Sequence, residues 1–169
     1  KSLIKEPAAE TDCDVVIIEL GGTVGDIESL PFLEAMRQFP HDVGRSNCMH
    51  VHVSLVPYIE TAGEVKTKPT QHSVARLREI GIQPDLLLCR SQNRFSDEAA
   101  EKLALFCNVE EEAVIQAPDV ESVYELPVVF QEQGLDQRII DRLKLECGPN
   151  NITEWEEMLE TLKNPKSET

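Results

Sequence analysis

Residues 14–28 read DVVIIELGGTVGDIE, and this stretch decides the fold that the sequence predicts. It begins with an apolar run, Val15–Ile18, which favours a strand buried on both faces, as in a parallel sheet. Glu19 follows at the carboxyl end of the expected strand, and the glycines within residues 21–25 permit a sharp turn or a close approach to a ligand. Because open α/β sheets bind ligands beyond the carboxyl ends of their strands, we expect the acidic residues of this stretch to line a crevice there.

The rest of the chain alternates between strand patterns and helix patterns. Further strands are expected at residues 49–56, 85–90 and 113–116, and helices at residues 30–39, 71–80, 96–106, 127–133, 136–143 and from 153 onward. This order is typical of an α/β fold with a parallel sheet and crossover helices. Only about four strands can be counted, and the sequence contains no phosphate-binding loop of the G-x-x-x-x-G-K-[ST] type. We therefore expect an incomplete segment of a larger domain.

Local patterns predict the faces and the ends of these elements. Helical spacing predicts that the following residues pack into the core: Phe32, Leu33, Met36 and Phe39 in the first helix, and Leu103 and Phe106 in the third. Thr70 is a predicted N-cap, Ser96 is another, and Thr153 with Glu156 is a predicted capping box.

The strand at residues 49–56 places two histidines on one face and three apolar residues on the other. These are His50 and His52 against Val51, Val53 and Leu55. We interpret the histidines as half-exposed strand side chains rather than metal ligands, because no third ligand stands nearby in the sequence.

A second notable stretch is GEVKTKPT, residues 63–70. Lys66 and Lys68 lie two positions apart, so an extended loop would direct both ammonium groups toward one polyphosphate. The alternative is an ordinary solvated basic loop. The anion-binding interpretation gains support from the order of elements, because the loop follows a strand and precedes a helix.

Composition limits the class of protein. The 169 residues are enough for one domain, and 41% hydrophobic residues can form a core. The net charge of -15 argues against a nucleic-acid surface. No apolar run suits a membrane span or a signal peptide, so we expect a cytoplasmic protein. The five cysteines are scattered singly, which favours reduced thiols over disulfides or a zinc site.

Three phrases carry a resemblance to a known family. ELGGTVGDIES at residues 19–29, GEVKTKPTQHSV at residues 63–74 and GIQPDLLLCRS at residues 81–91 resemble CTP synthase, in the C-terminal part of its synthetase (ammonia ligase) domain, and the resemblance runs from about Cys13 to Pro165. It implies a fold similar to dethiobiotin synthetase and the P-loop NTPases. It also implies that residues 1–163 form a partial synthetase domain, whose phosphate-binding loop lies upstream, and that residues 164–169 begin a linker to a glutaminase domain.

The resemblance implies an enzyme that uses ATP to phosphorylate O4 of UTP and then replaces the phosphate with ammonia from glutamine, giving CTP. Mg2+ is the implied cofactor and CTP the implied feedback inhibitor. The implied assembly is a homotetramer, with filaments left open, in which the UTP and CTP sites lie where subunits meet.

The family's functional residues carry over by position. Glu19 resembles a magnesium ligand, and a carboxylate is a suitable oxygen donor for that ion. The implied nucleotide-binding residues are Asp26, Ile27 and Glu28 for the pyrimidine nucleotide, Lys66, Thr67, Lys68, Pro69, Thr70 and Gln71 for its triphosphate, Lys102 for a further pyrimidine-nucleotide contact, and Pro118, Asp119 and Val120 beside the ATP base. Lys66 and Lys68 are the implied catalytic cations, because phosphoryl transfer depends on positioning and charge neutralisation. Pro118 departs from the family, which often has a longer polar residue there.

Other interpretations remain open at this point. Arg90 is either a further site residue or the partner of a carboxylate in an ion pair. Cys89 and Cys107 have no assigned role, so glutamine hydrolysis must be placed elsewhere. The chain as a whole is a fragment of a ligase, a nucleotide-sensing and oligomerisation module without catalysis, or a different P-loop-type ligase or partitioning ATPase, which the phrases GGTVGDIES and KTKPTQ argue against. We also expect the isolated chain to fold poorly, because its parallel sheet would have an open edge.

Overall fold

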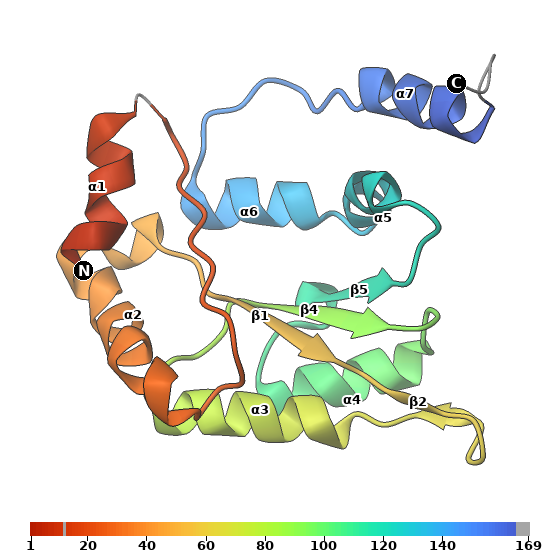
Figure 1. Cartoon of the computed structure of the whole chain (residues 1–169), viewed down its shortest axis with the longest axis horizontal. Coiled ribbons are helices and arrows are strands. Elements are labelled where there is room, and N and C mark those ends of the chain that lie inside the picture. Colours follow the sequence, from red (N-terminus) through yellow and green to blue (C-terminus); the bar gives the residue numbers. More distant parts are fainter. Residues whose placement is uncertain (12, 165–169) are drawn as a thin grey trace.

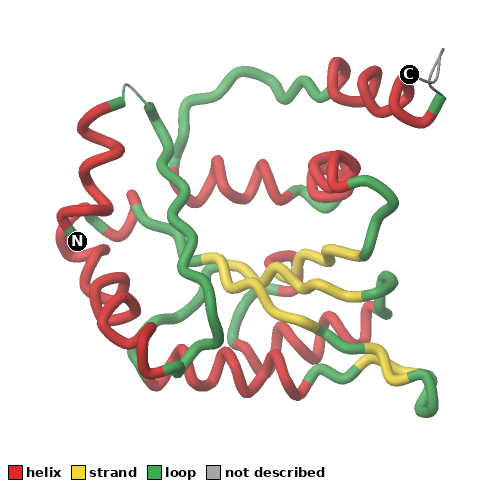
Figure 2. The backbone as a smooth tube through the Cα atoms, in the orientation of Figure 1, coloured by secondary structure: helices red, strands yellow, loops and turns green. Residues whose placement is uncertain are grey.

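The computed structural model describes residues 1–11 and 13–164, which form a parallel sheet flanked by helices (Figures 1 and 2). The helices are α1 (Ser2–Glu10), α2 (Leu30–Val43), α3 (Lys68–Glu79), α4 (Asp97–Cys107), α5 (Leu126–Glu132), α6 (Leu135–Leu143) and α7 (Thr153–Lys163). The strands are β1 (Val51–Leu55), β2 (Tyr58–Ile59), β3 (Glu64–Val65), β4 (Leu86–Ser91) and β5 (Val114–Pro118). Strands β1, β4 and β5 are parallel and lie in that order, whereas β2 and β3 form a separate antiparallel hairpin.

The predicted α/β class is confirmed, because α3 crosses over from β1 to β4 and α4 from β4 to β5. Both crossover helices lie on one face of the sheet, and α5 and α6 lie on the other (Figure 1). The main core lies between the sheet and the crossover helices, and its buried members are Val56, Val74, Leu87, Cys89, Phe95, Leu103, Ala104, Cys107 and Val114. A smaller cluster of Leu33, Leu77 and Ile82 joins α2 to the end of α3.

The strand predicted at Val15–Ile18 is absent, and this part of the prediction is wrong. Residues 14–20 are extended but have no strand partner, and Ile17 is 92% exposed. Among the described residues, residues 14–22 take part in no backbone hydrogen bond with another strand. An apolar, β-branched run fits a strand only where a neighbour completes the ladder, and β1 pairs with β4 alone. The expected fourth strand of the parallel sheet is therefore missing.

The two faces of β1 are the reverse of the prediction. His52 is only 8% exposed, and its Nε2 lies 3.0 Å from Ser73 Oγ on α3. Val53, in contrast, is 57% exposed, as are Val51 and Leu55 to similar extents. The histidine face is buried because α3 covers it, whereas no described element covers the valines. The interpretation of His52 as half-exposed is wrong.

Two predicted core aromatics also lie at the surface. Phe32 is 59% exposed at the start of α2, and Phe106 is 52% exposed at the end of α4. Each helix therefore buries a narrower stripe of side chains than its apolar pattern predicts. Leu33 and Leu103, on the same patterns, are buried as predicted.

Helix boundaries follow the sequence in most places. Ser96 caps α4 as predicted, its Oγ accepting a hydrogen bond from Ala99 N at 3.3 Å. Helix α3 begins earlier than predicted, at Lys68 with Pro69 in its first turn, so Thr70 is not its N-cap. The predicted capping box at Thr153 is also absent, since Ile152 is the N-cap of α7.

Within the described residues no helix is long and apolar enough to cross a membrane. The five cysteines are free thiols, as predicted.

Candidate functional site

The carboxyl edge of the sheet carries the two lysines of the KTKPTQ stretch, but the stretch is not the extended loop that the sequence predicts. Lys66 follows the β2–β3 hairpin, and its backbone N–H donates to Pro57 O at 2.8 Å. Its ammonium group forms an exposed ion pair with Glu64. Lys68 is already in the first turn of α3, where its Nζ donates to Gln71 Oε1 at 2.9 Å. The two cations therefore flank the start of a helix.

The polar side chains between and after the lysines are buried. Thr70 is fully buried and bridges α3 to β1: its Oγ1 accepts from Ser54 Oγ at 2.9 Å and donates to Leu55 O at 3.2 Å. Gln71 Nε2 donates to Thr67 Oγ1 at 3.1 Å. These contacts hold the first turn of α3 in place. Only the lysine side chains and Pro69 are exposed to a ligand here.

Lys102 lies near the same hairpin, on α4. It lines a cavity of about 330 Å³ together with residues of β2, β3, the loop before α4 and the start of α4, among them Tyr58, Glu64 and Arg94. The ring of Phe106, one turn further along α4, lies 5.1 Å from Lys68 Nζ. The structure thus brings Lys66, Lys68 and Lys102 to one end of the α3–α4 layer.

The acidic segment Asp26–Glu28 lies elsewhere. It precedes α2, and Asp26 Oδ2 accepts a hydrogen bond from Thr23 N at 3.0 Å. The neighbouring Gly25 has a φ of 103° and packs so closely on α3 that an added Cβ would lie 3.1 Å from Arg76 Nε. Arg76 is eight residues beyond Lys68, which corresponds to about 12 Å along the helix axis. Within one chain, the acidic segment and the lysines therefore lie toward different ends of α3.

Glu19 is exposed in the extended segment before the glycine turn. The described residues contain no cluster of three or more possible metal ligands. A single carboxylate supplies only part of the oxygen shell that Mg2+ requires. Glu19 therefore fits such an ion as one ligand among several.

Pro118, Asp119 and Val120 lie at the end of β5, again at the carboxyl edge. The backbone N–H of Asp119 donates to Ser91 O at 2.9 Å and extends the β4–β5 pairing. The Asp119 carboxylate lies 3.5 Å from Arg90, so the ion-pair interpretation of Arg90 is confirmed. Both side chains are mostly exposed, which makes this a weak contact.

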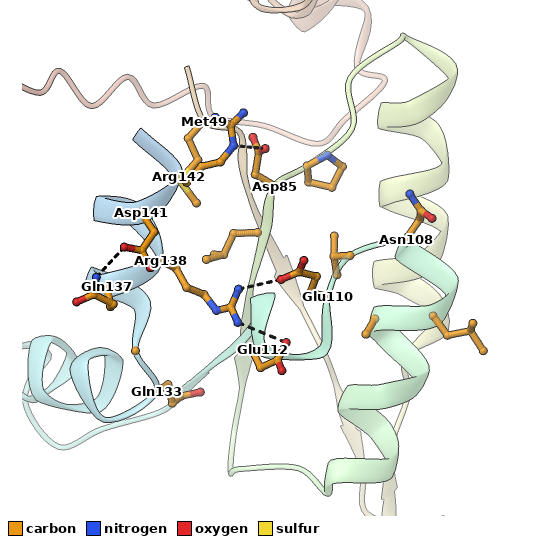
Figure 3. Close-up of a pocket in the computed structure, with 16 residues that line it drawn as sticks. Met49, Asp85, Asn108, Glu110, Glu112, Gln133, Gln137, Arg138, Asp141 and Arg142 are labelled. Atoms are coloured by element: carbon orange, nitrogen blue, oxygen red, sulfur yellow. Dashed lines mark hydrogen bonds and ion pairs between the residues drawn. The ribbon is translucent and has the colours of Figure 1, made fainter. Parts of the chain in front are cut away.

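A second cavity, about 1130 Å³, opens at the opposite edge, near the amino ends of β4 and β5 (Figure 3). Its arginines are paired with acids: Arg138 lies 3.3 Å from Glu110 and 3.4 Å from Glu112, and Arg142 lies 2.8 Å from Asp85. No sequence motif indicated this cavity, because its lining comes from segments far apart in the chain. Its charges are matched internally, so it lacks the free positive charge that a nucleotide phosphate requires.

Buried titratable groups do not add a nucleophile. Burial raises the pKa of the Cys89 thiol to about 12 and that of Cys107 to about 11, so both stay protonated at neutral pH. Burial also lowers the pKa of His52, which keeps its imidazole neutral against Ser73. These groups behave as core residues.

Comparisons with known proteins identify the chain. A family model described as CTP synthase N-terminus matches residues 1–145. The CTP synthase of Moorella thermoacetica is 57% identical over 164 residues, which is 97% of this chain and 30% of that relative. The CTP synthases of Carboxydothermus hydrogenoformans and Methanococcus aeolicus are each 54% identical over 99% of this chain and 31% of their own length. The chain therefore spans less than a third of these relatives.

The match begins at residue 1, so the similarity extends further toward the amino end than the resemblance from Cys13. It covers the glycine turn, both lysines, Lys102 and Pro118–Val120 in one continuous segment. From this match and the high identity to the relatives, the chain belongs to the CTP synthase family.

Proposed function

We propose that the chain is part of the synthetase domain of a cytoplasmic CTP synthase. The family model that matches it describes the N-terminus of CTP synthase, rather than the C-terminal part that the resemblance indicated. In this proposal residues 1–163 belong to that domain, and residues 164–169, of which 165–169 lie outside the described residues, begin the linker to a glutaminase domain. The whole protein would convert UTP to CTP with ATP, Mg2+ and ammonia from glutamine, through 4-phosphorylated UTP. Family membership supports the proposal.

The observation that carries the proposal is the pair of exposed lysines at the start of α3. The first turn of a helix presents unpaired backbone N–H groups and the positive end of its dipole, both of which favour an anion. Lys66 and Lys68 add two cations at that point, in a chain with a net charge of -15. We assign this position to the triphosphate of UTP or of the inhibitor CTP. The exposed lysines would neutralise phosphate charge, while Thr67, Thr70 and Gln71 would contribute backbone groups only.

The separation of Asp26–Glu28 from the lysines favours a site shared between subunits. The two groups lie toward different ends of α3, so the acidic segment and the lysines do not converge on one end of this helix within one chain. In a homotetramer, the acidic segment of one copy would meet the lysines and Lys102 of another. Pro118–Val120 would contact the ATP base, and Glu19 would supply one ligand to Mg2+.

A second candidate is a module that senses nucleotides and assembles subunits without catalysis. It is favoured for the isolated chain because no three possible metal ligands gather among the described residues. The catalytic and non-catalytic functions differ in whether the full-length protein makes CTP.

The decisive experiment measures CTP formation from UTP, MgATP and ammonia by the full-length protein and by its Lys66→Ala and Glu19→Ala variants. Ammonia bypasses glutamine hydrolysis, so only the proposed ligase chemistry is measured. We expect each variant to lose at least about tenfold in kcat/KM, equivalent to about 1.4 kcal/mol, because a charged contact is lost. Unchanged circular dichroism controls for folding. A full-length protein that binds UTP but makes no CTP would support the second candidate.

A further inference from the structure

Residues 117–132 lead away from the edge of the sheet and back to it. One side chain joins the two ends of this segment. The segment contains Pro118–Val120, the η4 turn (Val123–Glu125) and α5, and the chain returns to β5 at Gln133. The side-chain amide of Gln133 pairs with the backbone of Gln116: Gln116 N donates to Gln133 Oε1 at 2.8 Å, and Gln133 Nε2 donates to Gln116 O at 2.8 Å.

This pairing occupies the free edge of the sheet. Strand β5 is the last strand in the order β1-β4-β5, so alternate backbone groups point away from β4 with no strand to receive them. The amide of Gln133 bonds both groups of Gln116, as a neighbouring strand would. Two residues further on, the backbone nitrogen of Pro118 faces the same free edge. Proline has no N–H, so no backbone donor is left unpaired there.

Further contacts reinforce the pairing of Gln133 with Gln116, which we call the joint. Gln133 Nε2 also donates to Val129 O at 2.9 Å, which ties the amide to α5. The side chain of Gln116 repeats the pattern with Phe95, accepting from Phe95 N at 2.8 Å and donating to Phe95 O at 3.2 Å. Arg94, beside Phe95, lies 3.1 Å from Glu132. The joint therefore links β5, α5 and the loop after β4.

We propose that Gln133 is a positioning residue for ATP. It acts through the Pro118–Val120 segment, because it ties the end of α5 to the strand from which that segment departs. This rests on the proposed function, in which that segment contacts the ATP base. Without the amide pairing, Pro118–Val120 and α5 would be joined to the sheet by the chain alone, and ATP would have to order them on binding. Lys66 and Lys68 follow β1, on the opposite side of β4 from Gln133, so we expect UTP binding to change less than ATP binding. The one approach between the two is the cavity that Lys102 lines together with Arg94 and Phe95.

The test is the kinetics of CTP formation with ammonia by the full-length protein, varying ATP at saturating UTP and then UTP at saturating ATP. We expect Gln133→Leu to raise the KM for ATP about tenfold, the effect of about 1.4 kcal/mol, and to change the KM for UTP less than about twofold. Gln133→Glu keeps the acceptor for Gln116 N but loses both donated bonds, and it should raise the KM for ATP by a smaller factor. It serves as the test if Gln133→Leu does not fold.

Gln83→Leu is the matched control. Its side-chain amide also donates to backbone carbonyls, those of Pro84, Cys107 and Asn108, but it lies at the amino edge of the sheet, far from Pro118. We expect it to change neither KM. Equal effects of Gln83→Leu and Gln133→Leu, equal rises in both KM values, or a parental KM for ATP in the Gln133 variants would overturn the inference alone. A full-length protein that makes no CTP would remove the proposed function and this inference with it.

Discussion

At the scale of single residues, the two lysines of the candidate site differ in what holds them before a ligand binds. Lys68 contacts the neutral amide of Gln71 and lies near the ring of Phe106, and neither carries a charge that competes with a phosphate. Lys66 is paired with Glu64, and the ammonium group beside it holds the pKa of that carboxyl below its usual value. Glu64 therefore stays ionised at neutral pH and competes with a triphosphate for Lys66.

Replacing Glu64 with glutamine should strengthen nucleotide binding. Glu64→Gln removes the competing carboxylate, and the KM for UTP in the full-length protein should fall about two- to fivefold, since the ion pair that competes with the triphosphate is exposed and weak. The change should shrink at high salt, where exposed charges are screened. Glu60→Gln, an exposed glutamate in the same hairpin, is the control and should have less effect. A higher KM in Glu64→Gln would show that Glu64 assists binding.

At the scale of elements, the sequence predicted what local signals determine and missed what depends on a neighbour. Strand β4 and helix α4 were predicted closely, because an uninterrupted apolar run and a serine cap are local. The Val15–Ile18 strand and the exposed face of His52 were predicted wrongly, since the first needs a ladder partner and the second depends on where α3 packs. The lysine positions were read from the sequence, but their separation from Asp26 appears only in three dimensions.

Helix α3 illustrates the same point, because Thr70 faces β1 rather than solvent. Thr70 is fully buried, and Thr70→Val keeps the shape of its side chain but removes the hydrogen bonds to the Ser54 hydroxyl and the Leu55 carbonyl. We expect the full-length protein to lose about 1–3 kcal/mol of stability, seen as a lower thermal midpoint, with the KM for UTP unchanged. Thr61→Val makes the same chemical change in the exposed hairpin and should shift the midpoint little. A raised KM without loss of stability would instead make the Thr70 hydroxyl a nucleotide contact.

At the scale of the whole molecule, the described chain leaves one face of the edge strand β1 open. Val51, Val53 and Leu55 form an exposed apolar row on β1, and the uncovered Val15–Ile18 run adds to the apolar surface. Helices α5 and α6 lie on this side of the sheet but do not cover β1 (Figure 1). Apolar surface of this extent is unfavourable in water, and a parallel sheet is normally covered on both faces. The row is therefore expected to be buried in the full-length protein.

This expectation separates the isolated chain from the full-length protein. The isolated 169 residues should bind a hydrophobic dye and unfold without a sharp thermal transition, because the apolar row stays in water. Val53→Ser should reduce dye binding by the isolated chain, yet lower the stability of the full-length protein by about 2 kcal/mol or more, since it would then remove a buried side chain. Val123→Ser, an exposed valine outside the row, should do little in either. A sharp transition in the isolated chain, or a Val53→Ser effect as small as that of Val123→Ser in the full-length protein, would mean that the row faces solvent in the complete enzyme as well.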